Sequence, residues 1–545
     1  MNIFKYSSIR NDLFFCILIE YISINYCFHS TLSTYLLFYL TGALSVYFLI
    51  RFLQSVQPIL QKIIPLLLLL WGINEATYGW LQLYNFCESN NNLYKITGTF
   101  QNPGPYSGFL AVLIPIATYT ILNPAGRNIL LHAISKYISW IYVFLALTIL
   151  PAGMSRASWL ATIAGTTIIM TCHYKLNRRF KIYYYRHRKA VLLSAFFLII
   201  LLLVAGTGLY QMKKNSADGR LLMWKITTHI ISEHPLTGVG PGNFAGAYGQ
   251  AQARYFATAN ATTQEQYVAG SPEYGFNEFL QITAENGFIG FFLFLGLIVS
   301  AFRNTLKNRQ PGLAGSLISF LTFACFSYPF SVLQLNILFV ILLALTNTST
   351  QPSQKQQSLF TGLILLILVI PLVHYSKEWK QRQKAKIQWL EEQTYYNMDI
   401  YDETVNNYRQ LYRPLCDEPQ FLYELGQCLS KTRFYKESNL ILKEGAKFSA
   451  DPMFWNIMGK NYQAMGLYQE AEKCFLHAHN MIPHRLYPLY LLAQLYFHSG
   501  QPEKGIITAQ RLITQNPKVI SPAIEEIKAE MKEYLRNWTS DYSSN

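Results

Sequence analysis

The chain has 545 residues, of which 51% are hydrophobic, 15% aromatic and only 14% charged. A soluble chain averages about 25% charged residues, so this composition argues against an ordinary soluble protein and favours apolar surfaces that face lipid. The net charge is +15, but the basic residues lie largely in short segments between apolar runs, which is typical of membrane-protein loops rather than of a nucleic-acid-binding surface.

Apolar runs long enough to cross a bilayer recur from the N-terminus to residue 376, since a spanning helix needs about 20 mostly apolar residues. The first run follows Lys5 and Arg10 without a small-residue cleavage site, so we expect an uncleaved span rather than a signal peptide. The sequence predicts an all-α polytopic bundle of about eleven spans, with ten or twelve as neighbouring counts. The predicted spans are 12–28, 34–54, 59–82, 105–123, 133–152, 157–173, 190–210, 279–302, 312–328, 331–347 and 358–376.

Loop charge predicts the orientation of these spans. Segment 174–189 carries seven lysines or arginines and no acid, and segment 303–311 carries three more, so both are expected in the cytoplasm. The segment between them, 211–278, is then a large outer loop, and everything after residue 376 lies outside. Five basic residues soon after 376 run against this bias, which long terminal domains obey poorly.

Residue spacing in the C-terminal part indicates a helical repeat. Residues of the tetratricopeptide type recur from 455 to 483, equivalent residues stand 34 positions later, and a weaker copy precedes them. Small residues such as Gly459 and Ala471 let two helices approach, and large ones fill the space between repeats. We therefore divide the chain into a membrane domain at 1–376, a helical linker at 377–400, a tetratricopeptide-like solenoid at 401–530 and a flexible tail at 531–545. The two clearer copies comprise Trp455, Met458, Gly459, Tyr462, Gly466, Tyr468, Ala471, Phe475, Ala478 and Pro483, then Leu489, Leu492, Ala493, Tyr496, Gly500, Ala509 and Pro517.

Two arginines stand in predicted outer segments. Arg156 lies in a short loop between two spans, where it could snorkel to lipid headgroups or hold a phosphate with its planar fork. Arg220 lies early in the outer loop, and the glycine-rich segment 233–244 follows it. That segment reads either as a helix stop and turn or as backbone N–H groups brought close to an anion. Eight scattered cysteines form no Cys-x-x-Cys pair, so no metal or redox motif is predicted.

A polar stripe leads from the outer loop into the eighth predicted span. Asn277, Gln281 and Glu285 recur every four residues, which places them on one face of a helix, and Glu273 precedes them. Such stripes usually face a protein interior or a water-filled cavity. Hydrogen bonds between helices are an equally weighted explanation.

These segments together resemble the O-antigen ligase and polymerase superfamily, which also includes bacterial protein O-oligosaccharyltransferases. The resemblance covers roughly residues 1–350 and rests on the order of the motifs, the topology and the large outer loop. The motifs are Gln101-Asn-Pro103, Ser155-Arg-Ala157, Gly219-Arg220 with Trp224, His234-Pro-Leu-Thr-Gly-Val-Gly-Pro-Gly-Asn-Phe244, and Phe276-Asn-Glu-Phe-Leu-Gln281 with Glu285-Asn-Gly-Phe-Ile-Gly290.

The resemblance implies a glycosyltransferase of the bacterial inner membrane that uses an undecaprenyl-diphosphate-linked glycan on the periplasmic face, without metal or nucleotide cofactor. Its acceptor would be a lipid, a glycan or a protein Ser/Thr. The carried-over arginines Arg156 and Arg220 would bind the diphosphate, and Asn277 and Glu285 belong to the catalytic motif.

Many members of the superfamily have a histidine where this chain has Phe276, and phenylalanine cannot accept a proton. Glu273, His234 or His229 would then act as general base, or base catalysis would matter less in this branch.

Two other functions fit the same sequence. The chain could be a non-catalytic scaffold for envelope assembly that recruits protein partners through its repeats. It could instead be a transporter or flippase of lipid-linked glycans, although no inverted repeats are evident. The predicted outer arginines favour the enzyme over the scaffold.

Overall fold

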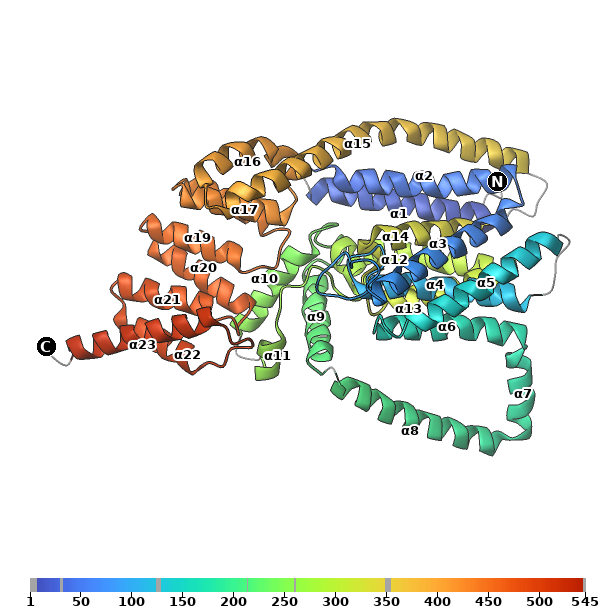
Figure 1. The fold of residues 1–545 in the computed structure, drawn as a ribbon, viewed down its shortest axis with the longest axis horizontal. Helices are drawn as coiled ribbons and strands as arrows, with labels where there is room; N and C mark the ends of the chain where they lie inside the picture. Colours follow the sequence, from blue (N-terminus) through green and yellow to red (C-terminus); the bar gives the residue numbers. More distant parts are fainter. Residues whose placement is uncertain are drawn as a thin grey trace.

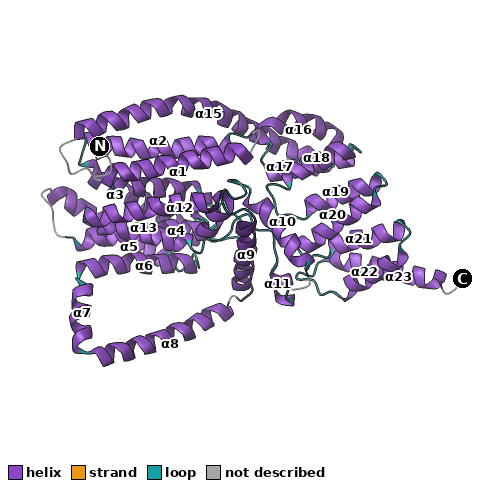
Figure 2. Cartoon of the chain, turned by 180° about the vertical axis from the view of Figure 1, so that it is seen from behind, coloured by secondary structure: helices purple, strands orange, loops and turns teal. Residues whose placement is uncertain are grey.

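The computed structural model describes residues 7–29, 33–123, 129–212, 214–258, 261–347 and 354–542. Within these ranges the chain forms 23 α-helices and one short 3-10 helix, with no β-strand (Figures 1 and 2). The prediction of an all-α polytopic protein is confirmed.

Each predicted span coincides with a helix. Among the described residues, α1, α2, α4, α5, α12 and α15 are long and apolar enough to cross a membrane, and α13 and α14 are shorter apolar helices. The total of eleven spans stays a prediction. The helices in the predicted spans are α1 (Ser7–His29), α2 (Tyr35–Val56), α3 (Leu60–Leu83), α4 (Pro103–Leu122), α5 (Ile129–Ile149), α6 (Arg156–His173), α8 (Arg188–Met212), α12 (Glu278–Lys307), α13 (Pro311–Ala324), α14 (Leu333–Leu345) and α15 (Gln354–Asn397).

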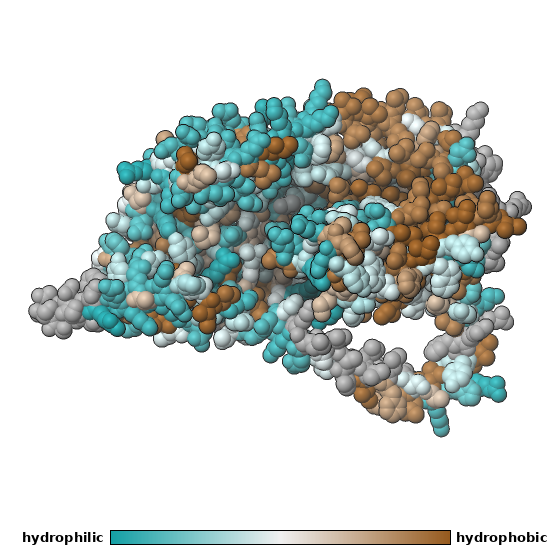
Figure 3. Space-filling model, in the orientation of Figure 1, coloured by the Kyte–Doolittle hydropathy of each residue, from teal (hydrophilic) through white to brown (hydrophobic). Residues whose placement is uncertain are grey.

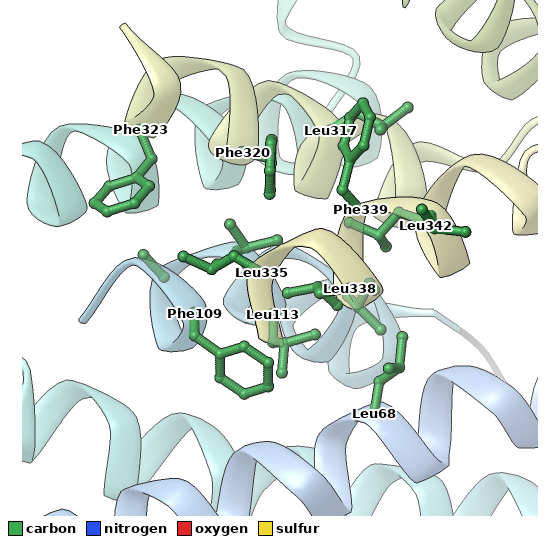
Figure 4. Close-up of a cluster of buried hydrophobic side chains, with 14 of the residues drawn as sticks. Leu68, Phe109, Leu113, Leu317, Phe320, Phe323, Leu335, Leu338, Phe339 and Leu342 are labelled. Atoms are coloured by element: carbon green, nitrogen blue, oxygen red, sulfur yellow. The ribbon is translucent and has the colours of Figure 1, made fainter. Parts of the chain in front are cut away.

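Helix α4 forms the centre of the membrane bundle, with α5, α6 and α13 packed around it. Its middle is apolar on every face, which is typical of a helix with protein on all sides. Phe109 and Leu113 on α4 lie under Phe320 on α13 and Leu338 on α14, and all four are buried (Figure 4). The face of the bundle seen in Figure 3 carries a broad hydrophobic surface, as expected for contact with lipid.

A buried polar network closes the end of the bundle that lies away from α10. The Asp12 carboxylate accepts hydrogen bonds from Arg51 Nε at 3.1 Å and Nη2 at 3.2 Å, from the Tyr47 hydroxyl at 2.7 Å and from Asn347 Nδ2 at 3.0 Å. Asn347 Oδ1 accepts from Asn304 Nδ2 at 2.6 Å. The network therefore ties α1, α2 and α12 to the segment that follows α14.

Four helices connect the spans outside the bundle: α7 (Leu176–Arg186), α9 (Lys214–Glu233), α10 (Phe244–Ala257) and α11 (Thr263–Val268). Helix α7, which carries much of the basic segment 174–189, lies at one end of the bundle, whereas α9, α10 and α11 lie at the opposite end (Figure 1).

The C-terminal part is a stack of helices, named here the helical stack. Helices α17 and α18, α19 and α20, and α21 and α22 pack as consecutive pairs, and each pair packs on the next. Gly459 lies against Phe475, so a Cβ at Gly459 would meet that ring at 2.4 Å. Assignment of these pairs as tetratricopeptide repeats stays a prediction. The stack comprises α16 (Tyr401–Leu415), α17 (Pro419–Lys431), α18 (Tyr435–Gly445), α19 (Met453–Ala464), α20 (Tyr468–Met481), α21 (Tyr487–His498), α22 (Pro502–Thr514) and α23 (Pro522–Tyr542).

The end of the chain differs from the predicted flexible tail at 531–545. Helix α23 continues to Tyr542, because Met531, Tyr534 and Leu535 recur at helical spacing and pack against α21 and α22.

The helical stack contacts the membrane domain through α10. A Cβ at Gly246 would meet the carbonyl oxygen of Lys447 at 2.0 Å, so only glycine allows this approach. Gln252 Nε2, fully buried, donates to the Met481 carbonyl at 2.5 Å and to the Gly270 carbonyl at 2.8 Å. Helix α15 runs beside α2 and continues without a break into the stack (Figure 1), which therefore lies at the same end of the bundle as α9 and α10.

Candidate active site

Two arginines from distant segments meet at the α9 end of the bundle. Arg156 is the first residue of α6, where the Ser155 side chain caps the helix by accepting from the Ser158 N–H. Arg220 lies in the first half of α9. Burial and the charge of Arg156 both lower the pKa of Arg220, so the two guanidinium groups lie within electrostatic reach of each other. We call them the arginine pair.

The surroundings make this arrangement costly without an anion. Two like charges repel each other, and the positive end of the α6 dipole adds to the repulsion on Arg156. Among the described residues, Arg220 makes no ion pair. An anionic ligand with several oxygen acceptors would remove the repulsion, because each guanidinium can donate two parallel hydrogen bonds.

Two contacts hold the Arg220 side chain in place. Its Nη1 donates to the carbonyl oxygen of Phe326 at 3.1 Å. Its guanidinium carbon lies 5.0 Å from the centre of the Phe276 ring, which is a cation–π contact. Phe276 has a φ of 49°, which is uncommon for a bulky residue and is often found at functional sites. Phe276, the departure from the family histidine, therefore acts here as a platform for Arg220.

A tyrosine cluster borders the arginine pair. The Tyr328 ring stacks on Tyr274 at 4.5 Å between centroids and meets the edge of Phe276 at 5.1 Å. Tyr94, Glu273 and Arg220 all lie within electrostatic reach of the Tyr328 hydroxyl. The same electrostatic reach brings Glu273, whose side chain is exposed, to the edge of the site.

The segments that contain the motifs Gln101-Asn-Pro103 and Ser155-Arg-Ala157 lie at this end as well. The Glu75 carboxylate, buried in α3, accepts from the Thr99 N–H at 3.1 Å and the Thr99 hydroxyl at 2.7 Å, which fixes the chain just before α4. A Cβ at Gly153 would meet Ser107 Oγ at 2.1 Å. Ser107 Oγ and Trp224 Nε1 are buried and have no hydrogen-bond partner among the described residues, so both can donate to a ligand.

The polar stripe on α12 serves structure at most of its positions. Asn277 caps α12, with its side chain accepting from the Leu280 N–H at 3.2 Å. Gln281 accepts from the Gly275 N–H at 2.9 Å and donates to Glu285 at 3.4 Å. The Glu285 carboxylate accepts from backbone N–H groups of Gly242 and Phe244, at the start of α10. The stripe therefore ties the outer loop to α12, and Glu285 fills the anion-binding position at the α10 N-terminus.

The two glycine motifs of the sequence interlock with each other. Gly287, at φ 63° inside α12, lies against the Leu236 carbonyl, and a Cβ there would meet that oxygen at 2.0 Å. Val239 N–H donates to the Ala284 carbonyl and Gly240 N–H to the Glu285 carbonyl, each at 2.9 Å. The Val239 and Gly240 N–H groups of segment 233–244 therefore bind α12, as in a structural turn, and are not free to bind a ligand.

His234 is not brought together with the arginine pair. It follows the last turn of α9, and at about 1.5 Å per residue the helix separates it from Arg220 by about 20 Å. His229, on the same helix, is exposed and packs its ring against Tyr255. Of the proton acceptors predicted from the sequence, Glu273 lies within electrostatic reach of Tyr328, as Arg220 does.

The structure also adds residues that the sequence did not single out. Tyr274 and Tyr328 border the arginine pair, although Tyr328 stands in the sequence only as the last residue of the predicted span 312–328. Glu278 is buried and accepts from the Phe330 N–H at 2.8 Å, which fixes the same loop that binds Arg220. Among the described residues no group of three or more His, Cys, Asp or Glu side chains is placed to hold a metal ion.

Residues 141–295 match the family model described as O-antigen ligase. The matched segment contains the arginine pair, the glycine-rich segment and the kinked part of α12, so the resemblance stated from the sequence is confirmed. No curated protein matches the chain.

Proposed function

Because the chain carries an O-antigen ligase domain, we propose that it transfers a glycan from an undecaprenyl-diphosphate-linked donor to an acceptor hydroxyl on the periplasmic face of the bacterial inner membrane. The observation that carries this proposal is the arginine pair. Two guanidinium groups at a membrane boundary, with Arg220 partly buried and unpaired by any described acid, suit a diphosphate better than any neutral ligand.

In the proposed reaction the acceptor oxygen attacks the anomeric carbon of the first sugar. The bond from that carbon to the diphosphate breaks, and the diphosphate leaves with the electron pair. Arg156 and Arg220 stabilise the negative charge that grows on the leaving oxygen, and the Trp224 N–H is a further donor. The acceptor proton passes to Glu273, which is exposed and can reach an incoming hydroxyl.

The proposed orientation follows from the basic segment at α7. That segment lies at the end of the bundle opposite the arginine pair and the helical stack (Figure 1). If α7 is cytoplasmic, as its charge predicts, the arginine pair and the stack are both periplasmic. Alkaline phosphatase fused after Lys380 should therefore be active, whereas a green fluorescent protein fused there should stay dark. Fluorescence at this position would reverse the orientation and with it the periplasmic reaction.

Transfer by the purified protein tests the proposal itself. The wild-type chain in nanodiscs should join an undecaprenyl-diphosphate oligosaccharide to lipid A core, a polysaccharide or a Ser/Thr peptide, with release of undecaprenyl diphosphate. A scaffold would produce no linked product, and a flippase would move the donor across a vesicle without breaking its sugar–phosphate bond. Absence of product with all three acceptor classes, from protein that is folded, would contradict the proposal.

A further inference from the structure

A cavity lies between the membrane domain and the helical stack. It has a volume of about 440 Å³, within the usual range of ligand pockets, and the surface view shows a recess between the polar stack and the apolar bundle (Figure 3). Its walls come from the outer end of α1, the glycine-rich segment, α10, and the stack from α16 to α19. The cavity exists only because the stack docks on α10.

The charges that line the cavity cancel. Asp417 and Glu444 contribute two carboxylates, and Lys443 and Lys447 contribute two ammonium groups. Glu444 is paired with Lys447 at 2.7 Å, and Asp417 is bound by Arg382 and by the Ser33 hydroxyl. A strongly anionic ligand would be repelled by Asp417 and Glu444, and a strongly cationic one by Lys443 and Lys447, so the lining favours a neutral ligand with many polar groups.

The remaining lining combines aromatic surface with unused polar groups. Tyr412, Phe448 and Trp455 supply aromatic surface on the stack side. Gln250 on α10 and Lys443 on α18 make no hydrogen bond to any described residue, so their donors, and the Gln250 acceptor, are available. Sugar rings combine apolar C–H faces with hydroxyls that donate and accept, which is the complement of such a lining.

The cavity is mechanically joined to the arginine pair through α12. Glu278 binds the Phe330 N–H beside the arginine site, while Glu285 binds the N-terminus of α10 beside the cavity. About two helical turns, or ~10 Å, separate these two residues. The cavity shares no lining residue with the arginine site, which suits units of the glycan other than the sugar bonded to the diphosphate.

We propose that this cavity binds sugar units of the glycan distal to the reacting bond, so that binding of the donor depends on the length of its glycan. The proposal rests on the proposed function for the identity of the glycan. Gln250 and Lys443 hydrogen-bond to sugar hydroxyls, and the aromatic side chains cover the ring faces. The stack would thereby contribute to substrate recognition without touching the reacting atoms.

The test compares a long and a short donor on one double variant. Gln250→Ala with Lys443→Ala removes two hydrogen-bonding groups without disturbing the packed core, since Lys443 is exposed and Gln250 only half-buried. We expect KM for a donor bearing the complete oligosaccharide to rise about tenfold, with kcat unchanged. KM for a donor bearing only its first sugar should stay at the wild-type value. Equal KM changes for both donors, or none for either, would overturn the proposal.

The matched control is Lys473→Ala, an exposed lysine on α20 that pairs with Glu470 and does not line the cavity. A second readout needs no transfer: calorimetry with the free oligosaccharide released from the long donor. The wild type and the control should bind it about tenfold more tightly than the double variant. Binding of the glycan without any transfer would support the cavity and contradict the proposed function, whereas transfer with equal glycan binding by all three proteins would contradict the cavity alone.

Discussion

Arg156→Lys and Arg220→Lys should each reduce the transfer rate about 100-fold, and the alanine variants more. Removing one preorganised donor from a charge that grows in the transition state commonly costs about 3 kcal/mol. Lysine keeps the positive charge but loses the planar fork that binds two phosphate oxygens. At Arg220 it would also lose the cation–π geometry over Phe276 and the hydrogen bond to the Phe326 carbonyl, so the remaining charge would be poorly placed.

The measurement is kcat and KM with a fixed lipid-linked donor, at matched levels of folded protein in the membrane. Arg254→Lys is the control, because Arg254 forms an exposed pair with Glu233 on the outer loop, where such pairs contribute little. If Arg156 merely snorkels to headgroups, Arg156→Lys would be nearly neutral, since lysine snorkels equally well. Near wild-type rates in both lysine variants would remove the diphosphate-binding role of the pair.

Asp12→Asn should produce the largest loss of stability among single substitutions at the far end of the bundle. Removing one partner of a buried ion pair leaves an uncompensated charge, at a cost of about 3–5 kcal/mol. The Asp12 carboxylate also accepts hydrogen bonds from Tyr47 and Asn347. The amide NH₂ of an asparagine at position 12 is itself a donor, so it would be placed against these donors. A substantially lower thermal unfolding midpoint in nanodiscs is the expected result.

The double variant Asp12→Leu with Arg51→Met separates the charge effect from loss of packing. Apolar replacement of both partners removes the uncompensated charge, so this variant should recover part of the stability that Asp12→Asn loses, although Tyr47 and Asn347 still lose their bonds to Asp12. The transfer kcat of the folded fraction should stay near wild type in either case, because the network lies at the opposite end from the arginine pair. An Asp12→Asn protein that unfolds at the wild-type midpoint would show that the pair contributes little.

The apolar periodicity of the spans was enough to predict the helices of the bundle, because lipid permits few alternatives to a helix. Arg156 could also be predicted, since a positive charge in a short outer loop stands against the usual bias, and Arg220 could be predicted from the family motif. Their meeting could not, because it depends on how α6 and α9 approach each other. The role of Phe276 could not be predicted either. The sequence shows only that the family histidine is missing, whereas the fold shows the Phe276 ring under the Arg220 guanidinium.

The glycines were the hardest residues to interpret from sequence. Segment 233–244 and the motif around Gly287 each allow several turn geometries, and their fit to each other is a contact between distant parts of the chain. No local sequence pattern marks Gly246. A glycine is required there because a Cβ would collide with the Lys447 backbone on the helical stack. Long-range backbone approaches of this kind follow from tertiary packing rather than from local propensity.

The length of helix α15 determines how the stack is rotated and how high it lies relative to the membrane domain. The helix is 44 residues long and continuous from its membrane half to its stack half, with Pro371 inside the membrane half. Each residue added within it would rotate the stack by about 100° and raise it by about 1.5 Å. The Gly246 contact tolerates neither change, so the helix can vary in length only in steps close to whole turns, such as seven residues for two turns. Its length therefore sets the height at which the stack docks on the membrane domain.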